Sequence, residues 1–290
     1  MTDASWRSPD PAAVERALEV LGDRRWLVLT GAGVSTDSGI PDYRGPGSPV
    51  RTPMTYQQFV AGPDSLQRYW ARAHLGWIRM GGAEPNAAHH RLVELESEGR
   101  LSGLITQNVD GLHRRAGHRH LVELHGRVDR VVCLDCGDRT PRARLQRRLA
   151  ALNPGWTSQD VEIAPDGDAI LEATEAFRVA TCERCGGRLK PDVVFFGENV
   201  RPQIVQHCFQ LTDEAEALVV LGSSLQVMSG LRFVRRARKN GIPVVIVNRG
   251  ATRGDELADV RLDAGCSETL TALAAALCGS GWRSPARQPR

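Results

Sequence analysis

Long apolar runs are missing from this sequence. No stretch approaches the ~20 consecutive apolar residues of a membrane-spanning helix, so we expect no contact with a membrane. The amino terminus also lacks the apolar segment of a secretion or organelle signal, and we therefore expect a cytoplasmic protein. Lysine is scarce as well: only Lys190 and Lys239 occur among 37 basic residues. This preference for arginine is typical of GC-rich coding sequences and favours a bacterial source.

A strong net charge is absent too. The formal charge is +3 over 290 residues, which is too small to indicate a nucleic-acid-binding chain, so no direct nucleic-acid partner is expected. A hydrophobic content of 41% with 24% charged residues is ordinary for a globular protein. The length is sufficient for one large core together with a small module. Nothing in the composition indicates an oligomeric state.

The third glycine of a dinucleotide-binding fingerprint is the most informative absence. Residues 26–29 (Trp-Leu-Val-Leu) predict a buried parallel strand. The Gly-Ala-Gly turn after it would let backbone N–H groups approach a phosphate, but Thr36 stands where the G-x-G-x-x-G pattern has its last glycine. The chain continues at residues 39–44 with Gly-Ile-Pro-Asp-Tyr-Arg. Turn chemistry alone requires neither the acid, the aromatic nor the arginine, so we interpret this stretch as a ligand-facing loop.

Apolar strands alternate with amphipathic helices along most of the chain. This order predicts an α/β fold, a Rossmann-like doubly wound parallel sheet. Polar motifs follow four of the expected strands, at Gly31, Gln107, Gly222 and Asn248. Because parallel strands end at one edge of a sheet, where ligands of open α/β sheets bind, these motifs are expected to converge on one site.

Four of the seven cysteines stand in two C-x-x-C pairs, Cys133 with Cys136 and Cys182 with Cys185. Each pair presents two thiolates from one tight turn, and two such turns predict a tetrahedral zinc site. Four thiolates close the site to substrate, so the zinc would be structural. Two unrelated pairs, or a redox pair, are the alternative.

These patterns divide the chain into units. We expect a Rossmann-like domain from residues 11–54, 85–130 and 191–278, with a small helical insertion at 55–84. An inserted zinc-binding module would occupy residues 131–190, and residues 279–290 would form a flexible tail.

Taken together, the motifs resemble the sirtuin family. Residues 31–35, 39–44, 106–113, 125–126, 194–198, 222–225 and 247–249 match in order, as do both cysteine pairs, and the resemblance covers roughly residues 13–278. It implies an NAD-dependent protein-lysine deacylase, which transfers the acyl group from lysine to ADP-ribose and releases nicotinamide. NAD would be consumed as a co-substrate, one Zn²⁺ would be structural, and the partners would be acylated lysine side chains of proteins.

The resemblance also implies roles for individual residues. His125 would be the general base that takes a proton from the ribose hydroxyls, with Asn108 as the second catalytic residue; a structural histidine is the alternative. The residues implied to bind NAD are Gly31, Ala32, Gly33, Ser35, Asp42, Tyr43, Arg44, Gln107, Asn108, Val109, Asp110, Gly222, Ser223, Ser224, Asn248, Arg249, Gly250 and Cys266. Those implied to bind the substrate peptide, as an added strand, are Val194, Phe195, Gly197, Glu198, Gln226 and Val227. The remaining histidines at positions 89, 90, 113, 118 and 120 are expected to be surface or packing residues.

The long segment between the cysteine pairs, including residues 152–156 and 164–168, resembles the class II branch of the family. That branch includes mitochondrial lipoamidase, acidic-acyl deacylase and ADP-ribosyltransferase members. Tyr69 and Arg72 also match a Tyr-x-x-Arg pair with which desuccinylating sirtuins bind a distal carboxylate, and positions i and i+3 of a helix share a face. A packed tyrosine and a solvated arginine are the alternative. We expect acidic or long acyl groups to be preferred over acetyl.

Three other functions remain open from the sequence. A protein mono-ADP-ribosyltransferase would pass the activated ribose to a protein side chain. A non-catalytic NAD-sensing or zinc-ribbon module would not need the general base implied at His125. A hydride-transferring dehydrogenase is disfavoured because the third glycine is missing and no acidic residue is suitably placed for the ribose.

Overall fold

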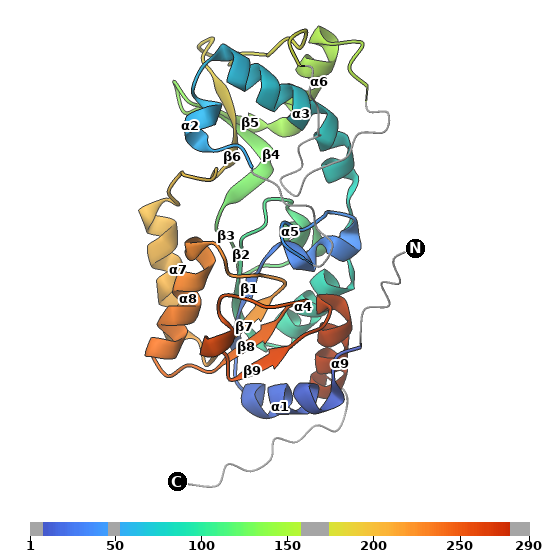
Figure 1. Ribbon diagram of the computed structural model, residues 1–290, viewed down its shortest axis with the longest axis vertical. Coiled ribbons are helices and arrows are strands. Elements are labelled where there is room, and N and C mark those ends of the chain that lie inside the picture. The colour runs from blue at the N-terminus through green and yellow to red at the C-terminus, as the bar shows by residue number, and fades with distance from the viewer. Residues whose placement is uncertain (1–7, 46–52, 158–173, 279–290) are drawn as a thin grey trace.

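The computed structural model describes residues 8–45, 53–157 and 174–278. Its larger lobe is built on a six-stranded sheet in the order β3-β2-β1-β7-β8-β9, in which every pairing is parallel (Figure 1). The strands are β1 Trp26–Thr30, β2 Leu101–Thr106, β3 Leu121–Glu123, β7 Ala217–Leu221, β8 Val244–Val247 and β9 Val260–Leu262. The strand order reverses between β1 and β7, and the carboxyl ends of these two strands are therefore the expected ligand site.

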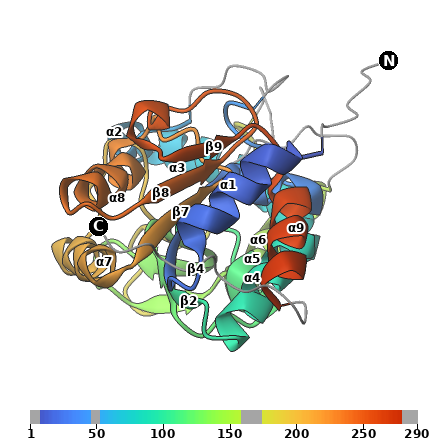
Figure 2. The same cartoon turned by 90° about the horizontal axis from the view of Figure 1, so that it is seen from below.

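Helices cover both faces of this sheet, as the doubly wound prediction requires (Figure 2). The elements α1 (Pro11–Leu21), α4 (Ala87–Ser97) and α9 (Cys266–Cys278) pack on one face, whereas α7 (Pro202–Glu214) and α8 (Met228–Lys239) pack on the other. Side chains of each strand alternate between the two cores: Val28 packs with the first group and Leu27 and Leu29 with the second. Burial on both faces explains why the strands are continuous apolar runs in the sequence.

The smaller lobe, at the top of Figure 1, contains a three-stranded antiparallel sheet in the order β5-β4-β6. Its elements are β4 Gly126–Cys133, β5 Arg139–Pro141, α6 Arg142–Leu152 and β6 Leu189–Val193. Both helices of the expected insertion, α2 (Tyr56–Phe59) and α3 (Pro63–Gly82), share one hydrophobic cluster with this sheet. The insertion and the cysteine module are thus a single packed unit.

A buried arginine fastens α3 to α6. The Arg142 guanidinium lies 5.2 Å from the ring centroid of Trp70 and 5.1 Å from that of Trp77, and it donates to the Ala73 carbonyl oxygen at 3.1 Å. The Trp70 indole N–H in turn donates to the Leu189 carbonyl at 3.0 Å. These contacts join α3 and α6 to the antiparallel sheet. The two indole rings and the carbonyl oxygen stabilise the buried positive charge of Arg142.

Short elements complete the described chain: η1 Ala32–Val34, η2 Thr36–Ser38, α5 Leu112–Ala116 and η3 Asp255–Leu257. Parts of three sequence expectations fall outside the described residues, namely positions 46–52 of the expected Rossmann-like domain, the class II segment at 164–168 and the tail at 279–290. The residue limits expected for the domains stay predictions. Within the described ranges, none of the helices has the length and apolar character needed to cross a membrane.

Candidate functional site

A large cavity lies between the carboxyl edge of the parallel sheet and the antiparallel sheet. It opens to solvent, and its space is about 1540 Å³ when the open solvent at its mouth is included. With the exception of Gly250, every residue expected to bind NAD lines it, and so does His125. The structure therefore brings together the four polar motifs that follow β1, β2, β7 and β8.

Glycines bring two of these motifs into direct contact. The Gly31 N–H donates to the Leu221 carbonyl at 2.9 Å. A Cβ on Gly31 would lie 2.7 Å from the Gly222 oxygen, and one on Gly33 would lie 2.9 Å from the Gly222 Cα. Gly222 itself has φ of +59°. The turns after β1 and β7 can interlock only because these positions carry no side chain.

The loop after β2 is held against the glycine turn by its own polar side chains. Asn108 donates from its amide to the Gly31 carbonyl at 2.9 Å and to the Ser35 hydroxyl oxygen at 3.1 Å. Ser35 donates to the Asp110 carboxylate at 2.8 Å, and the Leu112 N–H donates to the other oxygen of that carboxylate, also at 2.8 Å. Burial raises the pKa of Asp110, while these two hydrogen bonds counteract the rise. The result is a fixed row of amide and carboxyl groups facing the cavity.

His125 follows β3 and is held at both ring nitrogens. Its Nδ1 lies 2.8 Å from the Gln107 carbonyl oxygen. A carbonyl oxygen can only accept, so Nδ1 carries the hydrogen and Nε2 carries the lone pair. Burial lowers the pKa of His125 below its usual 6.5. The imidazole is therefore neutral at physiological pH, which is the protonation state that a general base requires.

The far end of the cavity is formed by the turn after β8. The Asn248 amide donates to the Arg249 carbonyl at 2.9 Å and to the Gly250 carbonyl at 3.0 Å, so Gly250 shapes the turn without lining the cavity. Cys266 lines the cavity, and burial raises the pKa of its thiol to about 12. The sulfur is thus a protonated packing group rather than a nucleophile.

The segment expected to bind peptide begins beside the general base. The Val194 N–H donates to the His125 carbonyl at 2.8 Å, and Val194, Phe195, Gln226 and Val227 all line the cavity. Gly197 and Glu198 lie outside its lining. Glu198 supports the segment instead, because its carboxylate accepts from the Phe195 N–H at 2.9 Å.

A buried lysine that the sequence did not single out completes this support. The Lys190 ammonium lies 3.0 Å from the Glu198 carboxylate and 5.0 Å from the Phe195 ring centroid. Burial lowers the pKa of this lysine, and Glu198 opposes the shift. In the sequence, the only signal for this residue was the rarity of lysine. Lys190 is one of two lysines, and it is buried beside Phe195, which lines the cavity.

The expected Tyr-x-x-Arg pair is placed only in part at the cavity. Tyr69 lines the cavity and is 6% exposed, with its ring centroid 5.1 Å from that of Phe59 and 5.4 Å from that of Phe195. Arg72 is half-buried one turn further along α3 and does not line the described cavity. The joint grip on a carboxylate therefore stays a prediction.

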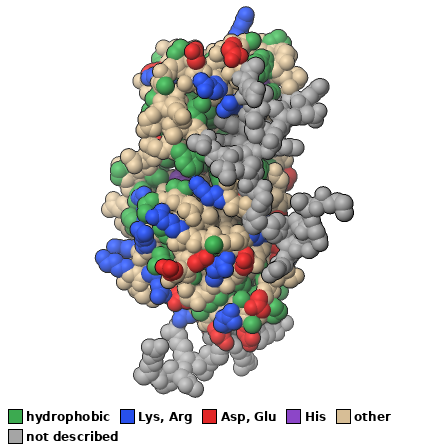
Figure 3. All heavy atoms as spheres, in the orientation of Figure 1, with side chains coloured by type: hydrophobic (Ala, Val, Ile, Leu, Met, Phe, Trp, Pro, Cys, Tyr) green, Lys and Arg blue, Asp and Glu red, His purple; other side chains and the backbone are tan. Residues whose placement is uncertain are grey.

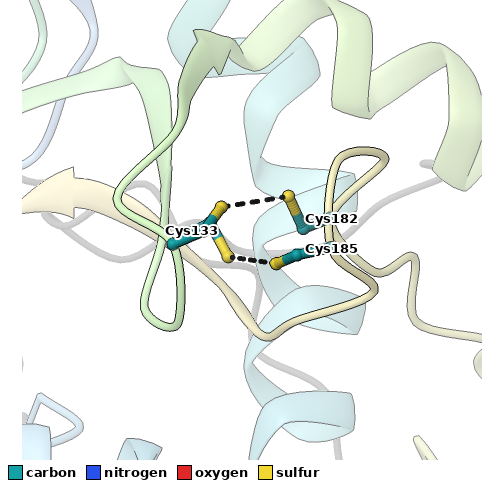
Figure 4. Close-up of side chains that lie close together, drawn as sticks. Cys133, Cys182 and Cys185 are labelled. Atoms are coloured by element: carbon teal, nitrogen blue, oxygen red, sulfur yellow. Dashed lines mark hydrogen bonds between the residues drawn. The ribbon is translucent and has the colours of Figure 1, made fainter.

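The four cysteines of the C-x-x-C pairs form one cluster, and in Figure 4 the labelled thiols point toward one another from two separate turns. The Sγ atoms of Cys133 and Cys185 lie 3.6 Å apart, and those of Cys136 and Cys182 lie 3.8 Å apart. Zinc–sulfur bonds of about 2.3 Å in a tetrahedron place sulfurs roughly 3.8 Å apart, whereas a disulfide needs about 2.05 Å. The cluster fits zinc and excludes disulfides among these four residues.

The two cysteine turns are also alike in their backbone. Gly137 donates to the Cys133 carbonyl at 3.0 Å and Gly186 donates to the Cys182 carbonyl at 2.8 Å. Both glycines have positive φ, of 73° and 75°. Each turn therefore offers two sulfurs on the same side, which confirms the predicted four-cysteine site.

Comparison with known proteins agrees with this geometry. The model of the Sir2 family matches residues 31–229. The chain is 53% identical over 279 residues to NAD-dependent protein deacetylase 1 of Mycobacterium avium, covering 94% of this chain and 97% of that protein. It is 50% identical over 254 residues to the human mitochondrial NAD-dependent protein lipoamidase sirtuin-4, covering 85% of this chain and 81% of that protein. A solved structure of Sir2 with a p53 peptide and NAD⁺ superposes with a TM-score of 0.72 at 31% identity, covering 90% of this chain and 96% of that one. The resemblance inferred from the motifs is confirmed, and the protein belongs to the Sir2 family, the sirtuins.

Proposed function

We propose that this sirtuin removes acyl groups from lysine side chains of proteins in a reaction that consumes NAD. The acyl group would pass to ADP-ribose, and nicotinamide and unmodified lysine would be released. One observation carries the proposal: a neutral histidine, His125, shares a cavity with the glycine turn, and its own carbonyl accepts from Val194, where the peptide segment begins. The activities in the names of the M. avium deacetylase and the human lipoamidase support it.

NAD would lie along the row of strand ends. The backbone N–H groups of the glycine turn, with the hydroxyls of Ser223 and Ser224, suit the pyrophosphate. The turn at Asn248 would hold the adenosine half. At the other end, the side-chain oxygens of Asn108 and Asp110 offer the acceptors that the amino group of a nicotinamide carboxamide needs. This orientation puts the nicotinamide ribose next to His125.

The reaction would proceed in two stages. First, the acyl carbonyl oxygen attacks C1′ of the nicotinamide ribose while the bond from C1′ to the nicotinamide nitrogen breaks. No proton transfer is needed for this stage. His125 then takes a proton from the ribose hydroxyls at Nε2, and the ribose oxygen attacks the imidate carbon. Addition of water and loss of the lysine amine complete the transfer of the acyl group to ADP-ribose.

The substrate peptide would enter as an extra strand between residues 194–195 and 226–227. Both segments line the cavity, one following β6 of the smaller lobe and the other preceding α8 of the larger lobe. Recognition of this kind uses main-chain hydrogen bonds and so places few demands on the peptide sequence. We therefore propose that acylated lysines in several proteins are substrates, and that the acyl group contributes most of the specificity.

We further propose that acidic or long acyl groups are preferred over acetyl. Tyr69 lines the cavity beside Phe195, and the 50% identity to a lipoamidase supports a large acyl chain. The test compares kcat/KM on acetyl-, glutaryl-, methylglutaryl- and lipoyl-lysine peptides of one sequence, with products identified by mass spectrometry. A clear advantage for acetyl would contradict this preference while leaving the deacylase intact.

The same experiment distinguishes the rival activities. A deacylase releases labelled NAD as acyl-ADP-ribose, whereas a mono-ADP-ribosyltransferase leaves the label on protein. A binding module would release no nicotinamide from NAD, whichever peptide of the panel is present. Label found only on protein, or no turnover on the whole panel, would overturn the proposed function.

A further inference from the structure

A hydroxyl group from α8 occupies the base nitrogen of His125. The Ser229 Oγ lies 2.8 Å from His125 Nε2, and the Gln107 carbonyl oxygen lies 2.8 Å from Nδ1 on the other side of the ring. Because Nδ1 carries the hydrogen, Nε2 accepts from the Ser229 hydroxyl. The imidazole is thus held between the end of β2 and the first turn of α8. Ser229 belongs to none of the motifs that indicated the family.

The start of α8 is built to come this close. A Cβ on Gly230 would lie 2.6 Å from Oε1 of the Gln107 side chain, so any other residue at this position would force that amide to move. Leu231, Phe233 and Val234 are buried and fix α8 on the parallel sheet. The two groups that flank His125 therefore come from elements locked to each other by packing.

We infer that Ser229 is a positioning residue for the general base: the Gln107 carbonyl sets the tautomer of His125, and the Ser229 hydroxyl bonds to Nε2, holds the imidazole ring in place and yields that nitrogen to the ribose hydroxyl of bound NAD. The inference rests on the proposed deacylase activity. In the other tautomer the Nδ1 lone pair would face the Gln107 oxygen, and Nε2–H could not accept a proton. A serine hydroxyl suits the exchange because it rotates and can either donate to Nε2 or accept from other groups.

Because the reaction has two stages, the positioning role of Ser229 can be distinguished by experiment from a purely structural role. Departure of nicotinamide needs no base, so exchange of labelled nicotinamide into NAD reports the first stage alone. Formation of deacylated peptide requires both stages. Loss of a residue that acts through His125 should therefore lower deacylation and spare exchange, whereas loss of a folding contact should lower both.

The experiment compares Ser229→Ala and Ser229→Thr with the wild type, using Ser97→Ala, an exposed serine of α4, as the control. Loss of one hydrogen bond to the base is expected to lower kcat for deacylation by roughly tenfold, with nicotinamide exchange within about twofold of the wild type. Ser229→Thr keeps a hydroxyl and should recover most of the deacylation rate. In ¹⁵N NMR spectra, the resonance of His125 Nε2 should shift in Ser229→Ala toward that of a ring nitrogen without a hydrogen bond, and remain unchanged in Ser97→Ala.

Two results would overturn the inference. One is a Ser229→Ala protein with wild-type deacylation and an unchanged resonance of His125 Nε2. The other is an equal fall in exchange and deacylation with a lower thermal midpoint, which would make Ser229 a folding contact only. If the wild type neither exchanges nor deacylates, the proposed function fails, and the NMR comparison alone decides whether the Ser229 hydroxyl bonds to His125 Nε2.

Discussion

The Gly33 N–H donates to the Gly222 carbonyl at 2.8 Å and joins the turns after β1 and β7 directly. This contact lies at the point where the strand order reverses, under the expected pyrophosphate site. Neither turn has room for a side chain, since a Cβ on Gly222 would lie 2.4 Å from the Val34 nitrogen. The NAD site and the centre of the sheet therefore depend on the same backbone contact.

Replacing Gly33 with alanine should weaken NAD binding by about tenfold or more and destabilise the fold by roughly 1–3 kcal/mol, because the new methyl meets backbone atoms that cannot swing away. Calorimetric titration with NAD and urea unfolding would measure the two effects. Gly62→Ala is the control, since nothing lies within 4 Å of its Cβ position and its φ of 167° suits any residue. Equal NAD affinity for Gly33→Ala and Gly62→Ala would contradict the interlocking of the turns.

Replacing His125 with tyrosine should abolish formation of deacylated peptide while sparing the fold and NAD binding. The cause is loss of the imidazole Nε2, whose lone pair would take the ribose proton. Burial lowers the pKa of His125, so the acid limb of the wild-type pH profile for kcat/KM should fall below pH 6.5. Peptide assays across pH 5 to 9 would test both statements. Full turnover by His125→Tyr would show the mechanism to be wrong.

The predictions from the sequence agree best with the structure for strands that are buried on both faces, because such burial requires a continuous apolar run. The strands β1, β7 and β8 are apolar on both faces, and their ends were predicted closely enough to bring Gly31, Gly222 and Asn248 to one edge. The cysteine site was equally accessible, because tetrahedral coordination restricts ligand spacing.

The antiparallel strands of the small lobe and two supporting residues could not be predicted from the sequence. Strand β4 is half-buried along most of its length and so shows no apolar alternation. Lys190 and Ser229 act through contacts with Glu198 and His125, and the contact of Ser229 spans more than a hundred positions in the chain. No local pattern encodes such pairs, because the packing of α8 and the cysteine turns creates them.

Removing one zinc ligand should unfold the small lobe. Cys133 and Cys182 belong to the same hydrophobic cluster as Phe59 and Trp70, so loss of the metal would loosen α2 and α3 as well. We expect Cys136→Ser to lose the bound zinc and at least about 3 kcal/mol of stability. Metal content and the thermal midpoint would be compared with Cys208→Ala, which removes a buried thiol distant from the cluster. Chelation that removes zinc without lowering the midpoint would argue against a structural metal.

Acid should destabilise the protein through a buried group of histidines at 89, 113 and 118. Burial is the largest cause that lowers the pKa of each, to about 3 for His89. In the unfolded chain the pKa of these histidines is near 6.5, so between the two pKa values the unfolded chain binds protons that the native state does not bind. The stability is complete above pH 6.5 and is lost as the pH falls from 6.5 toward 3, by about 2 kcal/mol at pH 5 for His89 alone.

Charged neighbours do not reverse this sign. Glu96 contacts His118 at 3.1 Å and the exposed His120 at 3.2 Å, and it raises the pKa of His118, but burial is the larger cause and leaves that pKa lowered. In urea unfolding at pH 7.5, 6 and 5, the free energy of unfolding should fall less for His89→Gln than for the wild type. His90→Gln, an exposed neighbour on the same helix, should follow the wild type. Parallel pH curves for all three proteins would exclude His89 as a source of the acid sensitivity.

Arg72→Met should separate acidic from neutral acyl substrates. Tyr69 reaches the cavity from α3, and Arg72 lies three residues further along that helix, so a small rearrangement on binding would bring its guanidinium to a distal carboxylate. A charge-assisted pair is worth about 1.5–3 kcal/mol, so kcat/KM for glutaryl-lysine should fall by roughly tenfold to a hundredfold while acetyl-lysine changes by less than about twofold. Arg68→Met, an exposed arginine one turn earlier on α3, controls for the loss of positive charge. If Arg72→Met lowers kcat/KM equally for both substrates, Arg72 supports the fold of the small lobe and takes no part in acyl selection.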